Sequence, residues 1–188
     1  MAIASKILIT GGMRSGKSRF ALSLANASGR PKVFLATAES FDAEMSQRIQ
    51  RHRQERDPAF LTLEEPLHVG EALASVSPDS VVIIDCLSLW LNNLLFYGEG
   101  DETKVQEHVS AFVKSVKNSK VQLIVVSNET GCGTIPANEL SRRYIEHLGL
   151  LNQRIAALSD QVILMTAGLP LWVKGLPLPA AGTVSYLQ

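Results

Sequence analysis

The stretch that decides the fold lies near the start of the chain and reads Ile7-Leu8-Ile9-Thr10-Gly11-Gly12-Met13-Arg14-Ser15-Gly16-Lys17-Ser18. The apolar run that ends at Thr10 predicts a β-strand, and residues 19–25 predict a helix. The residues between them match G-x-x-x-x-G-K-S/T, the pattern of a phosphate-binding loop. A flexible Gly/Ser turn would explain neither the Lys-Ser pair in register nor the preceding strand. The stretch therefore predicts a nucleotide site.

Each residue type in this loop has a chemical reason to be there. Gly11 and Gly16 let the backbone turn where a Cβ would clash. The amides of the loop and of the first helical turn can then point inward, where the helix dipole favours negative charge. Lys17 can reach the β- and γ-phosphates, and Ser18 can hold a magnesium ion. We expect residues 11–18 to bind the nucleotide, with Lys17 catalytic.

Composition limits the class of protein. The 188 residues, 46% of them hydrophobic, suit a single domain with a real core. A net charge of +0 gives no support for nucleic-acid binding. Cys86 and Cys132 lie far apart in sequence, which favours reduced thiols and a cytoplasmic protein. Residues 1–6 carry no secretory apolar segment, and no run reaches the roughly 18 apolar residues of a membrane helix, so we expect no stable membrane insertion.

Short apolar runs alternate with helical patterns along the chain. Strands are expected at 6–10, 33–38, 60–63, 81–85, 121–126 and 161–165, with a short edge strand at 172–174. Helices are expected at 19–27, 42–56, 69–76, 87–96, 105–116 and 139–159, the last one broken near Gly149. This alternation predicts an α/β fold with a mostly parallel sheet and helices on both faces. We expect one domain over 1–174 and a loosely held tail over 175–188.

Four separate segments place polar residues at or just beyond strand ends, where parallel sheets collect ligands. They are Ser18, Thr37, Asp85 and the pair Asn128-Glu129. Asp85 could hold magnesium with Ser18, or it could cap the next helix. Asn128 and Glu129 could contact substrate or simply begin a turn. The apolar stretch 87–96 suits core packing and a subunit interface equally well.

His52 is the histidine with the most suggestive surroundings. It shares a helix face with Met45 and Ile49, which alone favours a packing role. Four arginines surround it in sequence: Arg48, Arg51, Arg53 and Arg56. Their charge disfavours imidazolium and keeps the ring neutral, the form that attacks phosphorus. The same arginines could bind a triphosphate or form a solvated basic face.

In addition to the phosphate loop, several segments of the sequence resemble those of a known family. They are Ala36-Thr37-Ala38, Asp42-Ala43-Glu44-Met45, Arg48-Ile49-Gln50-Arg51-His52-Arg53, Asp85-Cys86-Leu87, Asn92-Asn93-Leu94-Leu95, Ser127-Asn128-Glu129-Thr130-Gly131 and Asn152-Gln153-Arg154. From about Lys6 to Lys174 the chain resembles the bifunctional adenosylcobinamide kinase/adenosylcobinamide-phosphate guanylyltransferase family of cobalamin biosynthesis. The R-I-Q-x-H segment and S-N-E-x-G are more specific than the phosphate loop, which many enzymes share.

The resemblance implies a P-loop NTPase-like fold and two reactions. ATP or GTP phosphorylates adenosylcobinamide, and GMP from GTP then passes through a guanylylated histidine to adenosylcobinamide phosphate, giving adenosylcobinamide-GDP and pyrophosphate. The guanylylated residue falls on His52, and a homotrimer that requires Mg²⁺ is implied. The other nucleotide-contacting positions implied are Ala36, Thr37, Ala38, Arg53, Gln54, Glu55, Arg56, Glu64 and Asp85. The alternatives are a small-molecule kinase that transfers only the γ-phosphate, and a non-catalytic nucleotide switch.

Overall fold

The computed structural model describes residues 6–40, 57–98 and 101–176, together with Ala43, Gln47 and Gln50, which are helical. The rest of the helix expected over 42–56 lies outside the described residues. So do five of the expected site residues: His52, Arg53, Gln54, Glu55 and Arg56. In the part of the chain that is described, no helix combines the length and apolar character needed to cross a bilayer.

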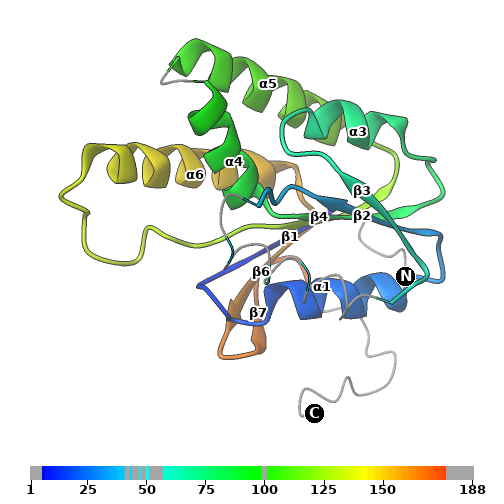
Figure 1. Ribbon diagram of the computed structural model, residues 1–188. Coiled ribbons are helices and arrows are strands. Elements are labelled where there is room, and N and C mark those ends of the chain that lie inside the picture. Colours follow the sequence, from blue (N-terminus) through cyan, green and yellow to red (C-terminus); the bar gives the residue numbers. More distant parts are fainter. Residues whose placement is uncertain are drawn as a thin grey trace.

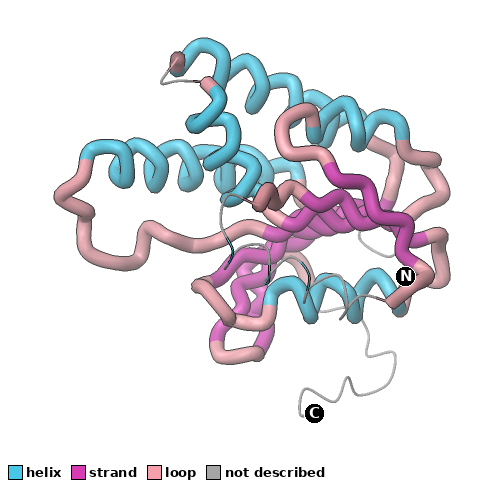
Figure 2. The backbone as a smooth tube through the Cα atoms, in the orientation of Figure 1, coloured by secondary structure: helices cyan, strands magenta, loops and turns pink. Residues whose placement is uncertain are grey.

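A seven-stranded sheet forms the centre of the described structure (Figures 1 and 2). Its strands are β1 (Lys6–Gly11), β2 (Lys32–Ala36), β3 (Phe60–Glu64), β4 (Val81–Asp85), β5 (Gln122–Val126), β6 (Gln161–Thr166) and β7 (Leu169–Lys174). Their order is β3-β2-β4-β5-β1-β6-β7, with β7 alone antiparallel to its neighbour. This confirms the mostly parallel sheet and the edge strand, which is longer than the sequence predicted.

Helices cover both faces of the sheet (Figure 1). They are α1 (Lys17–Asn26), α3 (Val69–Ser75), α4 (Leu87–Tyr97), α5 (Glu102–Asn118) and α6 (Glu139–Leu158). Because side chains alternate along a strand, β1 sends Ile7 and Ile9 toward α1 and Leu8 toward the other helices. Accordingly Ile7 and Ile9 share an apolar cluster with Phe20 of α1, whereas Leu8 shares one with Trp90 of α4.

The apolar segment 87–96 packs into the core. Leu87, Trp90, Leu91 and Leu94 of α4 are buried. The ring of Trp90 lies 4.7 Å from that of Phe112 in α5, centroid to centroid. Core packing therefore explains the apolar character of most of this helix.

The expected break near Gly149 is wrong, because α6 runs unbroken from Glu139 to Leu158. A mid-helix glycine costs only about 1 kcal/mol relative to alanine. The buried face formed by Leu148, Leu151 and Ile155 outweighs that cost. The side chain of Asn138 also caps the helix by accepting a hydrogen bond from the Ser141 amide at 3.1 Å.

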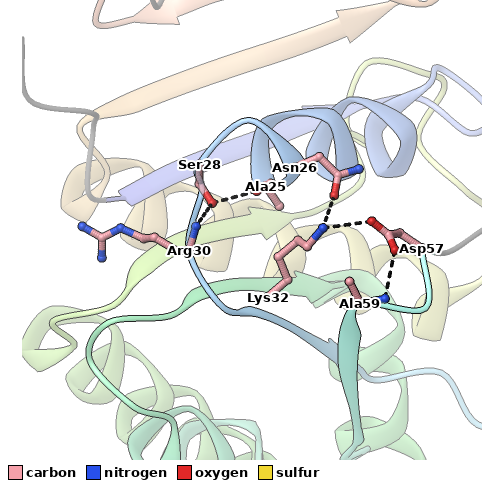
Figure 3. Close-up of polar contacts among 7 residues, drawn as sticks. All are labelled: Ala25, Asn26, Ser28, Arg30, Lys32, Asp57 and Ala59. Atoms are coloured by element: carbon pink, nitrogen blue, oxygen red, sulfur yellow. Dashed lines mark hydrogen bonds and ion pairs between the residues drawn. The ribbon is translucent and has the colours of Figure 1, made fainter.

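Polar contacts fasten the amino-terminal side of the sheet, opposite the strand ends that carry the phosphate loop. Lys32, the first residue of β2, donates to Asn26 Oδ1 at 2.8 Å and to Asp57 Oδ2 at 2.9 Å (Figure 3). Asp57 Oδ1 in turn accepts from the Ala59 amide at 2.9 Å. These contacts connect the end of α1 to β2 and to the segment that leads into β3. They leave the carboxyl ends of the strands for ligand binding.

Candidate nucleotide-binding site

The glycine-rich loop joins β1 to α1 and needs glycine at two positions for different reasons. Gly11 has φ 145°, and a Cβ there would collide with the carbonyl oxygen of Met165 in β6. Gly16, the residue before α1, has φ 94°, a left-handed conformation that glycine adopts without strain. At the tip of the loop, Met13 is 77% exposed and Arg14 has φ 57°.

Lys17 is folded back into this loop. Its side chain is buried, and Nζ donates to the carbonyl oxygens of Gly11 at 2.9 Å and Gly12 at 2.6 Å. The turn between β6 and β7 supports the loop from outside, since the Gly168 amide donates to Ser15 O at 3.1 Å. A buried ammonium thus lies beside the start of the loop, with a positive charge where a phosphate would bind.

The amino terminus of α1 is suited to an anion. Gly16 has no side chain with which to cap the first turn, and that turn carries no acidic residue. The helix dipole favours a phosphate at this end of the helix. Ser18, partly buried in the same turn, lies where its hydroxyl can join a cation to the phosphates.

Asp85 ends β4 and does not cap the next helix. The N-cap of α4 is Cys86, whose side chain makes no capping hydrogen bond. The Oδ2 atom of Asp85 is buried without a hydrogen-bond partner. An unpaired buried carboxylate oxygen is costly, and a bound cation would offset that cost.

Thr37 connects the ends of β2 and β4. Its hydroxyl donates to Cys86 O and accepts from the Cys86 amide, both at 2.8 Å, and its carbonyl accepts from Asn93 Nδ2 at 2.8 Å. Ala36 pairs with Asp85 on one side and with Glu64 on the other. The predicted site residues on β2, β3 and β4 therefore lie together, with Ala38 just beyond them. Of these three strands β4 lies nearest to β1, from which β5 alone separates it.

A buried polar network surrounds Ser88, which sequence reasoning missed. Asn128 Nδ2 donates to Ser88 Oγ at 2.7 Å, and Tyr144 OH donates to Ser88 O at 3.1 Å. Cys86 Sγ also contacts Ser88 Oγ at 2.9 Å. In the same region Asn152 Nδ2 donates to Asn128 O at 3.0 Å. The network joins the ends of β4 and β5 to α4 and α6.

The ionisable groups in this network are neutral at physiological pH. Burial, followed by the charge of Asp85, raises the pKa of the Cys86 thiol to about 11. Burial also raises the pKa of Tyr144 to about 12. Neither group therefore adds negative charge to this region.

A glycine-rich loop around a buried lysine, with a carboxylate two strands away in a parallel sheet, defines the protein as a P-loop nucleotide-binding α/β protein. It belongs to the cobinamide kinase/cobinamide phosphate guanyltransferase family, whose family model matches residues 7–173. The bifunctional adenosylcobalamin biosynthesis protein CobP of Pseudomonas aeruginosa is 43% identical over 172 residues, which cover 91% of this chain and 98% of that protein. The corresponding protein CobU of Escherichia coli is 32% identical over 180 residues, which cover 89% of this chain and 99% of that protein.

Solved structures support the fold at lower identity. The type III secretion ATPase EscN of enteropathogenic Escherichia coli superposes with a TM-score of 0.56 at 10% identity, covering 87% of this chain and 43% of that one. Another type III secretion ATPase gives a TM-score of 0.50 at 11% identity, covering 87% of this chain and 51% of that one. The chain thus spans about half, or less, of these larger ATPases. At such identities the similarity concerns the fold, and it confirms the P-loop α/β architecture.

Proposed function

We propose that this protein phosphorylates adenosylcobinamide with ATP or GTP, then transfers GMP from GTP to adenosylcobinamide phosphate, giving adenosylcobinamide-GDP and pyrophosphate. The observation that carries the proposal is the phosphate loop built around buried Lys17, within a chain that matches the bifunctional family over residues 7–173. The family match favours two activities over a kinase that transfers only the γ-phosphate.

In the kinase reaction the loop holds the triphosphate and Lys17 neutralises it. Nζ exchanges its carbonyl partners at Gly11 and Gly12 for phosphate oxygens. The hydroxyl oxygen of adenosylcobinamide attacks the γ-phosphorus, forming one P–O bond as the bond to the β-phosphate oxygen breaks. The hydroxyl proton is lost to water. The nucleotide contacts belonging to this proposal are residues 11–18, Ala36, Thr37, Ala38, Glu64, Asp85 and, outside the described residues, Arg53, Gln54, Glu55 and Arg56.

Mg²⁺ fits the residues present. It is usually bound by one or two protein oxygens, with phosphates and water completing its shell. Ser18 and Asp85 supply a hydroxyl and a carboxylate oxygen, and the unpartnered buried Oδ2 of Asp85 supports this assignment. When bound, the ion neutralises charge that develops on the phosphates. The described residues hold no cluster of three or more His, Cys, Asp or Glu side chains suited to a metal. A Mg²⁺ ion bound to phosphates does not need such a cluster.

We assign the guanylyl transfer to His52. A neutral imidazole nitrogen attacks the α-phosphorus of GTP, so a P–N bond forms while the bond to the pyrophosphate oxygen breaks. A phosphate oxygen of adenosylcobinamide phosphate then attacks the same phosphorus, the P–N bond breaks, and the imidazole is restored. Splitting one displacement into two in this way is nucleophilic catalysis. The sequence supports it, because flanking arginines favour the neutral ring.

The test is covalent labelling by GTP that carries a radioactive α-phosphate. The wild-type protein should acquire an acid-labile label that adenosylcobinamide phosphate removes, and His52→Ala should acquire none. His108→Ala, on the outer helix α5, is the matched control and should label normally. A wild-type protein that phosphorylates adenosylcobinamide but takes no label would leave only the monofunctional kinase.

We further propose that the protein is a cytoplasmic homotrimer with one catalytic domain over 1–174 and a tail over 175–188. Light scattering at several concentrations tests the trimer.

The first residues of the tail contact the domain: Gln161 Nε2 donates to Leu176 O, and Gly175 packs closely against Asp160 O. A chain truncated after Leu176 should therefore unfold at the wild-type temperature and keep both activities, whereas truncation after Lys174 should lower the unfolding temperature.

A further inference from the structure

The end of β5 lies between the phosphate loop, which follows β1, and Asp85 at the end of β4. Ile9 of β1 and Asp85 of β4 both pair with Val126, the last residue of β5. The chain beyond Val126 continues beside the phosphate loop, since the Ser127 amide donates to Ile9 O at 2.9 Å and the Glu129 amide donates to Gly11 O at 3.0 Å. A triphosphate that reaches from the loop to a cation on Asp85 must therefore pass Asn128.

The amide of Asn128 is fixed in this position from two directions. Its Nδ2 donates to Ser88 Oγ at 2.7 Å, and its main-chain oxygen accepts from Asn152 Nδ2 at 3.0 Å. Ser88 is only 2% exposed, and Tyr144 OH holds its main-chain oxygen. Asn128 itself is only partly buried. A rigidly supported side-chain amide therefore lies at an edge that a ligand can reach.

The chemistry of the neighbours favours Asn128 over Glu129 as the group that meets a phosphate. Glu129 Oε1 accepts from the Gly131 amide at 2.9 Å, so this carboxylate stabilises the turn after β5. A carboxylate would also repel phosphate oxygens, whereas an uncharged amide N–H donates to them. Of the two roles that the sequence allows here, turn formation therefore fits Glu129 and substrate contact fits Asn128.

We propose that Asn128 is a γ-phosphate contact, whose side-chain amide donates to a γ-phosphate oxygen of the bound nucleoside triphosphate, and that Ser88 is its positioning residue. The proposal rests on the proposed function only in requiring that the site binds a nucleoside triphosphate. It gives the site a means of preferring triphosphate over diphosphate, because only the triphosphate extends far enough to reach β5. It also gives the buried network around Ser88 a functional role.

Calorimetric titration with ADP and β,γ-imido-ATP tests this directly. A guanine pair, GDP and β,γ-imido-GTP, is titrated in a His52→Ala background so that no nucleotidyl transfer interferes. Asn128→Ala should weaken binding of the triphosphate analogue about tenfold or more, the effect of losing a hydrogen bond to a charged group. Binding of the diphosphate should change less than about twofold. Ser88→Ala should lower the ratio of triphosphate affinity to diphosphate affinity by a smaller factor than Asn128→Ala does. An unchanged ratio would show that Ser88 does not position Asn128.

Asn128→Asp separates phosphate contact from structural support. Aspartate can still accept a hydrogen bond from the Ser88 hydroxyl, so a purely structural residue 128 would tolerate it better than alanine. If Asn128 contacts the phosphate, Asn128→Asp should instead bind the triphosphate analogue more weakly than Asn128→Ala, because the new carboxylate faces the γ-phosphate. Asn26→Ala, at the far end of α1, is the matched control and should keep the wild-type ratio. If the wild type binds no nucleotide, the proposed function fails; if it binds normally and both Asn128 variants keep its ratio, this inference fails.

Discussion

Thr37 and Cys86 exchange two hydrogen bonds through one hydroxyl: Thr37 Oγ1 donates to Cys86 O and accepts from the Cys86 amide, each at 2.8 Å. The two residues lie 49 positions apart in the chain. Thr37 is fully buried, so water cannot replace either bond. This one hydroxyl therefore fixes the end of β2 against the residue that follows Asp85.

Thr37→Val removes that hydroxyl while keeping the shape of the side chain. It leaves the buried N–H of Cys86 without a partner, at a cost of about 1–3 kcal/mol, whereas the Cys86 carbonyl still accepts from the Trp90 amide at 3.1 Å. We expect the free energy of unfolding to fall by about 2 kcal/mol in urea titrations. Thr37→Ser keeps the hydroxyl and should lose only the value of a buried methyl group, about 1 kcal/mol. Equal stabilities of the two variants would contradict the role assigned to the hydroxyl.

Gly11→Ala tests the steric argument for the first glycine of the phosphate loop. The Cβ would meet the Met165 carbonyl in a conformation, φ 145°, that is largely restricted to glycine. We expect a loss of about 3 kcal/mol in unfolding free energy, or failure to fold. Gly12→Ala is the matched control for stability, because a Cβ there has nothing within 4 Å. Its unfolding free energy should stay within about 0.5 kcal/mol of the wild-type value.

The two cysteines should differ strongly in reactivity. Cys132 is exposed and Cys86 is buried, with the pKa of Cys86 raised to about 11. At pH 8 the thiolate fraction of Cys86 is then about one in a thousand. A thiol reagent should modify one cysteine quickly in the folded protein, and Cys132→Ser should abolish that fast reaction. Two equal fast reactions without denaturant would contradict the burial of Cys86.

The same pKa shift gives the sign of a stability change with pH. The folded protein holds the Cys86 proton more tightly than the unfolded chain, in which the thiol pKa is near its ordinary value of 9.0. The stabilisation is therefore complete below about pH 9 and is lost as the pH rises toward 11. Cys86→Ser, compared with the wild type over this range, should show a smaller fall in unfolding free energy.

The sequence predicts best what local patterning controls. Residues 81–85 and 87–96 were predicted almost to the residue, because four buried β-branched positions and an apolar helix leave few alternatives. The phosphate loop was predicted from its own residues, since its glycines serve local geometry. Strand β7 begins at Leu169, earlier than the sequence predicts. It includes Pro170, a residue that an edge strand tolerates and a central strand does not.

The network around Ser88 could not be predicted in this way. Its hydrogen bonds join Asn128 to a residue 40 positions earlier, and Asn152 to one 24 positions earlier. Those contacts depend on strand order, which no local pattern in the sequence specifies. The sequence therefore leaves Asn128 open to substrate contact or turn formation, because its role depends on the position of β5 between β1 and β4.

Gly149→Ala should stabilise the protein, and it tests why the helix break predicted from the sequence is absent. Gly149 lies in the middle of α6, and an added Cβ would meet nothing within 4 Å. Alanine restricts the unfolded chain and suits a helix better by about 1 kcal/mol. We expect the free energy of unfolding to rise by about that amount in urea titrations, with nucleotide binding unchanged. A fall in stability would mean that the glycine is required by a close approach at this point of α6.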